Sequence, residues 1–450
     1  MPQLIELPNE TLEQIIESFH SDDIDSFSIC CKHLYALSAA KFPKHKQMKR
    51  QYSYTSCSVD RPGTFNVSHA VLLFRAFSEN PDITKYVKTL QLQCRHSHQV
   101  MTVSQDLQEE LRAFVQSLPY LTASQKDKWI EGSLDGLEGR TTALILLMLP
   151  RLEKLVLQDS YGYSLARNAN TAIEELMISA AGPGHSTGNM VLSHLSHVEL
   201  TRDALNPQPT ELIHLFAGLP SMRYLRARRM IDLSDNWTAT HSNSALTKLV
   251  LDECTIRVKS LLRILASIAA LQEFSYSCDL PTNNNMEEGE PKEVVRQLLQ
   301  SASHSLVSLD LNDRSYTRSY MHSENTKAHF MGSLQGFQVL TRIRVEYRMF
   351  VENGPKDSAQ GLRTHQMRDV LPASVESVTL TGPMLDYENM ATLVEGLGEQ
   401  KDMRNVKVKK PPRLEKVFYE SCKSSVKLWR VRRLFSKARG IDFILKQVTN

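Results

Sequence analysis

The residues of this sequence best suited to chemistry are Cys94, His96 and His98 in the stretch CRHSH. On an extended segment alternate residues share one face, so a thiolate and two imidazoles would point toward one zinc ion. A structural zinc site takes four ligands, and no second ligand cluster of matching spacing accompanies these three. We therefore expect polar residues at a strand end here, and no metal or cofactor.

No other motif predicts catalysis. The glycine-rich stretch GPGHSTG (182–188) lacks the Gly-Lys-Ser/Thr of a phosphate-binding loop. The signatures of zinc metalloproteases and protein kinases are also missing from the sequence. We expect a non-catalytic protein without a small-molecule substrate, whose function lies in binding.

Basic and aromatic residues on predicted strands are better candidates for a binding site. The predicted substrate-binding set is Tyr224, Arg226, Arg228, Arg342 and Arg344. Guanidinium groups bind carboxylates and phosphates, so this set would suit an acidic or phosphorylated protein segment. The alternative is an ordinary solvated sheet face, which is always polar.

These candidates lie on a repeated pattern, an apolar residue at positions one, four and six of each copy. Copies stand at 87–92, 152–157, 173–178 (IEELMI), 195–200, 222–227, 246–251, 271–276, 306–311, 340–345 and 375–380, with a further one near 406. The alternation at the end of each copy is typical of a half-buried strand. The stretches 141–149, 211–219, 258–271, 291–306 and 387–397 favour helices between the strands.

The spacing of the copies predicts a solenoid. From Leu155 to Val378 the middle apolar residues are separated by 21, 22, 27, 24, 25, 35, 34 and 35 residues. The first five gaps resemble leucine-rich repeats, whose period is about 20–29 residues. The Asn that usually follows the strand is missing from most copies, so the repeats are degenerate. We predict an α/β solenoid with parallel strands and outer helices.

The three long gaps contain insertions at 279–293, 313–327 and 351–361. Each insertion follows a predicted strand and precedes a predicted helix, which puts all three on one edge of the solenoid. They would form a binding lip there, or they are tolerated surface loops.

The start of the chain has a different pattern. After Asn9, a good helix N-cap, the residues Leu12, Ile15, Ile16 and Phe19 form one apolar stripe. A second stripe follows within residues 21–38, so we predict two or three short helices over residues 7–45 before any repeat begins.

Residues 7–38 resemble an F-box. The features that match are Leu7-Pro8, Glu10, Ile15-Ile16, Asp23-Ile24, Cys31-Lys32 and Leu34-Tyr35. The segment 70–92 is similar to the one that leads into the repeats of fungal F-box proteins with leucine-rich repeats. The resemblance implies a substrate receptor of an SCF-type cullin-RING ubiquitin ligase. Such a receptor docks onto a Skp-type adaptor, and through it onto the cullin-RING scaffold, and binds an unidentified protein substrate through its repeats.

The resemblance also implies which residues contact the adaptor. They are Leu7, Pro8, Glu10, Leu12, Ile15, Ile16, Phe19, Ile24, Phe27, Cys31, Lys32 and Leu34. A three-helix unit of this size buries little apolar surface alone, so Leu7, Pro8, Ile15 and Ile16 should stay partly exposed. The alternatives are a helical cap on the solenoid, or a repeat scaffold for protein or nucleic acid with no ubiquitin role.

The predicted domains follow from these patterns. They are an F-box module (1–50), a helical linker (51–86), the solenoid (87–410) and a basic C-terminal cap (411–450). Residues 401–450 hold 15 Lys and Arg against 4 Asp and Glu. This tail suits a nuclear signal, a nucleic-acid patch or a packed cap. We favour the cap, because its aromatic residues are too few for base stacking.

Composition predicts a protein kept inside the cell. No apolar run approaches the ~20 residues that span a bilayer, and the N-terminus does not have the pattern of a signal peptide. The 7 cysteines include no CxxC pair and should remain reduced. We expect a cytoplasmic or nuclear protein that binds neither membrane nor nucleic acid.

Overall fold

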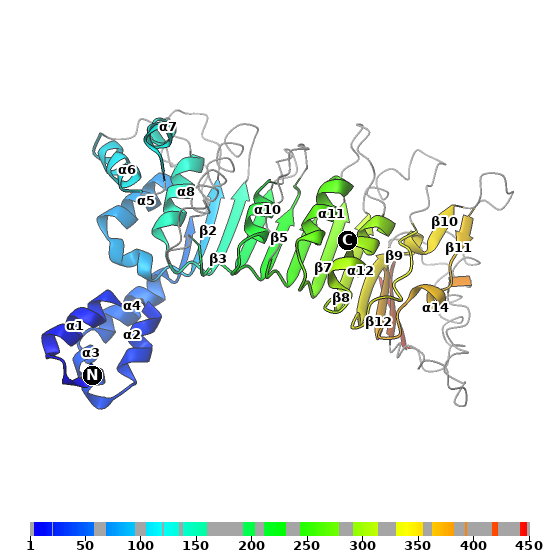
Figure 1. Cartoon of the computed structure of the whole chain (residues 1–450), viewed down its shortest axis with the longest axis horizontal. Coiled ribbons are helices and arrows are strands. Elements are labelled where there is room, and N and C mark those ends of the chain that lie inside the picture. The colour runs from blue at the N-terminus through cyan, green and yellow to red at the C-terminus, as the bar shows by residue number, and fades with distance from the viewer. Residues whose placement is uncertain are drawn as a thin grey trace. The chain divides into compact units, whose positions relative to one another are not determined.

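A computed structural model describes most of the chain (Figure 1). The chain forms two compact units, Met1–Asn206 and Pro207–Asn450. Each unit is considered by itself below. The described residues are 4–19, 21–57, 69–94, 105–118, 121–134, 138–159, 192–202, 211–230, 244–278, 291–313, 330–353, 362–381, 392–393, 416–421 and 442–447.

The first unit contains a parallel sheet. Its strands, in order, are β1 (Tyr54–Cys57), β2 (Thr89–Cys94), β3 (Lys154–Asp159) and β4 (His197–Arg202). The register aligns Leu90 with Leu155 and Leu155 with Val198. These three marker residues are 0% exposed, so they stack into one apolar core as the repeat pattern predicts.

Two features of this sheet differ from the prediction. The strands β3 and β4 pair directly, whereas the repeat pattern predicted a further strand between them. Residues 173–178 themselves lie outside the described part of the chain. The strand β1 was not predicted: it falls within 51–86, where we expected a helical linker, and it pairs with β2.

Several helices lie between these strands in the sequence. They are α5 (His69–Glu79), the 3-10 helix η2 (Pro81–Lys85), α6 (Gln105–Ser117), α7 (Ala123–Leu134) and α8 (Glu138–Met148). The last of these confirms the helix expected over 141–149. Phe74 of α5 packs edge-on against Phe114 of α6, with ring centroids 5.7 Å apart, and Trp129 of α7 is buried.

The N-terminal helices form a small module. After the 3-10 helix η1 (Leu4–Glu6) come α1 (Asn9–Ser18), α2 (Ser21–Ser28), α3 (Lys32–Ala39) and α4 (Phe42–Tyr52). The helix α1 begins one residue earlier than expected, with Pro8 as its N-cap and Asn9 inside it. Leu12, Ile16, Ile24 and Leu34 are buried as the core of the module.

The second unit continues the same architecture. Its parallel strands are β5 (Tyr224–Arg228), β6 (Lys248–Asp252), β7 (Glu273–Cys278), β8 (Ser308–Asp313), β9 (Arg342–Glu346), β12 (Ser377–Thr381), β13 (Lys416–Ser421) and β14 (Asp442–Gln447). The marker residues pair in register from Leu225 to Val378 and are buried. The strands β12 and β13 pair directly, and the copy proposed near 406 lies outside the described residues.

Helices link these strands, as Figure 1 shows for α10 (Glu211–Ala217), α11 (Val258–Ala266) and α12 (Pro291–Ala302). They confirm three of the predicted helices. The fold is therefore a mixed α/β repeat with a parallel sheet, as predicted.

The predicted lip is only partly described. The third insertion, 351–361, connects the two strands of a small antiparallel hairpin. It begins with β10 (Val351–Asn353), and β11 (Leu362–Thr364) follows it. The 3-10 helix η3 (Tyr347–Phe350) precedes this hairpin and α14 (Met367–Val370) follows it. Residues 330–341, after the second insertion, form turns and no helix, against expectation. Most of all three insertions lies outside the described residues.

Candidate functional site

The structure separates the predicted adaptor-binding residues into two groups. Four of them are core residues of the N-terminal module and face no partner: Leu12, Ile16, Ile24 and Leu34. The expectation that Ile16 stays partly exposed is wrong, because Ile16 is 1% exposed. The accessible members are Leu7, Pro8, Glu10, Ile15, Phe19, Phe27, Cys31 and Lys32.

The module also exposes three apolar side chains outside the predicted adaptor-binding set. Ile29 is 80% exposed, Tyr35 is 56% exposed and Leu4 is 46% exposed. Among the side chains that the structure describes, six large apolar ones are at least 39% exposed, and three of these lie in this module. Large apolar side chains that are this accessible on a small domain are candidates for contact with a partner. Ile29 was missed because it follows α2 and belongs to no helical stripe.

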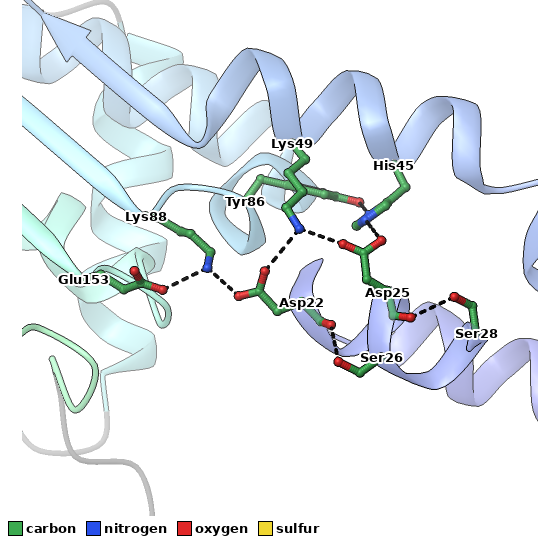
Figure 2. Close-up of polar contacts among 9 residues, drawn as sticks. All are labelled: Asp22, Asp25, Ser26, Ser28, His45, Lys49, Tyr86, Lys88 and Glu153. Carbon is green, nitrogen blue, oxygen red and sulfur yellow. Dashed lines mark hydrogen bonds and ion pairs between the residues drawn. The ribbon is translucent and has the colours of Figure 1, made fainter. Parts of the chain in front are cut away.

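A polar network fixes α2 to α4 and to the first repeat (Figure 2). Asp22 accepts from Lys88 Nζ at 2.6 Å and from Lys49 Nζ at 3.3 Å. Lys88 Nζ also lies 2.9 Å from Glu153, just before β3. Asp25 lies 2.6 Å from Lys49 Nζ. Since Lys88 directly precedes β2, one ammonium group connects the helical module to two strands of the sheet.

A buried histidine extends the same network. His45 on α4 lies with Nε2 3.2 Å from Asp25 and Nδ1 3.2 Å from the hydroxyl of Tyr86 (Figure 2). An imidazole that donates from Nε2 to a carboxylate leaves Nδ1 to accept from a hydroxyl. His45 therefore has both ring nitrogens satisfied in the interior.

Charges in this network stabilise one another. Burial alone would raise the pKa of Asp22 and Asp25, but ammonium hydrogen bonds outweigh it and lower both pKa values. Lys49 and Lys88 provide these bonds at Asp22, and Lys49 does so at Asp25. The hydrogen bond to Asp25 in turn raises the pKa of Lys49. All four groups are therefore held in their charged forms at neutral pH.

Two more links join the module to the sheet. Arg151, before β3, donates to Asp23 of α2 at 2.8 Å. The carbonyl of Ser53, between α4 and β1, accepts from the amides of Lys88 and Thr89. The helical module and the first repeats are thus one connected structure.

The predicted substrate-binding residues lie on the polar face of the parallel strands in the second unit, and most of them are already paired. Arg226 donates to Asp252 through Nε at 2.9 Å and through Nη2 at 2.6 Å. Glu273 accepts from Lys248 at 2.7 Å and from Arg342 at 3.2 Å. Opposite charges on different strands therefore pair with one another across this face.

The other members of the set also lie on this face. Tyr224 lies beneath Lys248, whose Nζ is 5.5 Å from the ring centroid. Arg228 donates to Glu253 at 3.0 Å, and Arg344 lies half-buried on β9. The five residues thus share one face of the sheet, as predicted, without forming a single free basic cluster.

Other sequence candidates are not tested. Cys94 ends β2, while His96 and His98, the stretch 182–188 and most of the basic tail lie outside the described residues. Among the residues that are described, no cluster of His, Cys, Asp and Glu is placed to hold a metal ion. None of the described helices is long and apolar enough to cross a membrane.

Comparison with known families decides the class of the repeats. The family model described as "Leucine-rich repeat domain" matches residues 79–422, more than half of the chain. The chain belongs to the leucine-rich repeat family. No curated protein matches the chain in sequence. A leucine-rich repeat domain is a repeat-based scaffold for protein binding.

Proposed function

We propose that this protein is the substrate-recognition subunit of an SCF-type cullin-RING ubiquitin ligase. Its N-terminal helices would dock onto a Skp-type adaptor, and its leucine-rich repeats would bind a protein substrate. The chain would contribute no catalytic group. It would act by positioning, because holding the substrate near the ligase raises its effective concentration. A cytoplasmic or nuclear location is part of this proposal.

The observation that carries the proposal is the N-terminal module itself. It combines an F-box-like sequence with a buried core of its own and with exposed apolar side chains, Ile29 and Tyr35 foremost. A few exposed aromatic and aliphatic side chains are sufficient to anchor an interface. A helical cap would bury such residues against the repeats instead.

Point variants test adaptor docking better than deletion of the N-terminus. Deletion of residues 1–45 would also remove Asp22, Asp25 and His45, and so disturb the first repeat. We expect Ile29→Ser with Tyr35→Ser to weaken co-purification with a Skp-type adaptor by at least about tenfold, since interface anchors contribute 2 kcal/mol or more.

The matched control is Leu72→Ser on α5, which changes another exposed apolar residue, 43% accessible. This variant should bind the adaptor like the wild type. Equal adaptor binding by all three proteins would count against docking through this surface. The competing function is a repeat scaffold without a ubiquitin role, for which no adaptor would be recovered at all.

A further inference from the structure

Two adjacent arginines at the end of β5 share one buried carboxylate. Arg228 Nη2 lies 3.0 Å from Glu253 Oε1, and Arg229 Nε lies 2.6 Å from Glu253 Oε2. The Glu253 side chain is 11% exposed, while those of Arg228 and Arg229 are 38% and 33% exposed. Each carboxylate oxygen therefore orients one guanidinium group whose other end reaches solvent.

The backbone holds this arrangement in place. Arg229 and Glu253 each follow directly after a strand, at equivalent points of successive repeats, with φ of 59° and 53°. Such left-handed backbone is uncommon for residues other than glycine. The amide of Arg229 donates to the carbonyl of Asp252, and the amide of Glu253 donates to the hydroxyl of Ser277. The two turns are thus fixed by neighbouring repeats.

Much of the donor capacity of the two arginines is unused. Within the described residues, Arg228 makes one side-chain hydrogen bond, through Nη2, and Arg229 makes one, through Nε. An arginine carries five N–H donors, so several remain at each guanidinium group. Beside them Arg226 is paired with Asp252.

We propose that Arg228 and Arg229 form a binding site for a compact oxyanion, a phosphate or a carboxylate, on a partner protein. Planar guanidinium groups bind both anions through paired N–H donors. Because Glu253 holds the two groups before the anion arrives, little side-chain entropy remains to be lost on binding. The site lies at the carboxyl ends of parallel strands, an edge that carries ligands in many open sheets.

This inference refines the partner-binding role of the repeats and rests on it, but it does not depend on the adaptor. It places the contact with an acidic partner at Arg228 and Arg229, and no longer at Arg226 and Arg342. Both of those residues are paired on the sheet face, whereas Arg228 and Arg229 share a single carboxylate.

The test measures anion binding by the full-length protein. Inorganic phosphate is titrated into the protein at constant ionic strength, and binding is measured as a rise in the melting temperature of the protein. Degenerate peptide libraries with a fixed central phosphoserine, glutamate or serine then distinguish the two protein-borne anions from free phosphate. The variants are Arg228→Gln with Arg229→Gln, and the matched control is Arg342→Gln, an exposed arginine that also pairs with one glutamate.

We expect the double variant to lose at least tenfold in affinity for the phosphoserine or glutamate library, and Arg342→Gln to lose less than twofold. Arg228→Lys with Arg229→Lys keeps both positive charges but removes the planar guanidinium groups, so it should also bind these libraries more weakly than the wild type, and it serves if the glutamine double variant does not fold. Unchanged binding in a folded double variant, or a loss in Arg342→Gln equal to that of the double variant, would overturn the proposal. Adaptor co-purification should be unaffected in all these variants, so failure here leaves the adaptor hypothesis standing.

Discussion

At the scale of single residues, the aspartates of α2 connect the N-terminal module to the repeats. Asp22 and Asp25 are not fully buried, with side chains 39% and 46% exposed, so solvent screens part of each interaction. They nevertheless receive three ammonium contacts from Lys49 and Lys88 and one contact from His45. A network of this kind stabilises more than an isolated surface pair does.

Replacing both aspartates with asparagine should therefore lower stability. We expect a loss of about 1–2 kcal/mol after allowing for solvent screening. That corresponds to a fall of roughly 2–8 °C in the first thermal transition, measured by circular dichroism. The exposed Asp127→Asn is the matched control and should melt like the wild type.

The same substitution predicts a pH dependence with a definite sign. Both aspartates have a lowered pKa in the folded protein, so their contribution is complete above the ordinary aspartate pKa of about 4 and is lost as the pH falls below it. The difference in melting temperature between wild type and Asp22→Asn/Asp25→Asn should be full at pH 7 and shrink towards pH 3. A difference that grows on acidification would contradict this account.

At the scale of strands and helices, the apolar markers of each repeat are the main source of stability. Leu249 on β6 is 0% exposed and is in register with Leu225 and Phe274. Leu249→Ala should lower the free energy of unfolding by about 2–5 kcal/mol, because it leaves a cavity in the core of stacked marker residues. Val250 is the next residue and lies on the polar face. Val250→Ala should lower the free energy of unfolding, measured with urea, by less than half as much. Similar losses for the two variants would show that the core is not built on these markers.

Alternation along each copy was sufficient to predict most strands, because it reports which residues of a segment are buried. It carries no information about which strand is the neighbour. The pattern at 173–178 therefore predicted a strand between β3 and β4, although these two strands pair directly. The strand β1 was missed for the opposite reason, since Tyr54–Cys57 is short and polar and gains its place by pairing with β2.

The same limit applies to the candidate sites. The sequence placed Arg226 and Arg342 on the polar face, but their carboxylate partners lie on other strands and depend on register. Arg229 was missed because it follows the strand, where alternation ends. An Arg-Arg pair and an Asp-Glu pair at equivalent points of successive repeats were the available signal.

At the scale of the whole molecule, the chain joins a small helical module to a leucine-rich repeat domain that covers residues 79–422. Under the proposed function these two parts have separate partners, an adaptor and a substrate. Each set of variants should therefore remove one class of partner and leave the other.

The most direct test is affinity purification with mass spectrometry from cells, comparing wild type with Ile29→Ser/Tyr35→Ser. We predict that the wild type recovers a Skp-type adaptor and a cullin together with other proteins. The variant should lose the adaptor and the cullin and keep the proteins bound by its repeats. Recovery of repeat-bound proteins by the wild type, without any ubiquitin-ligase subunit, would contradict the proposal.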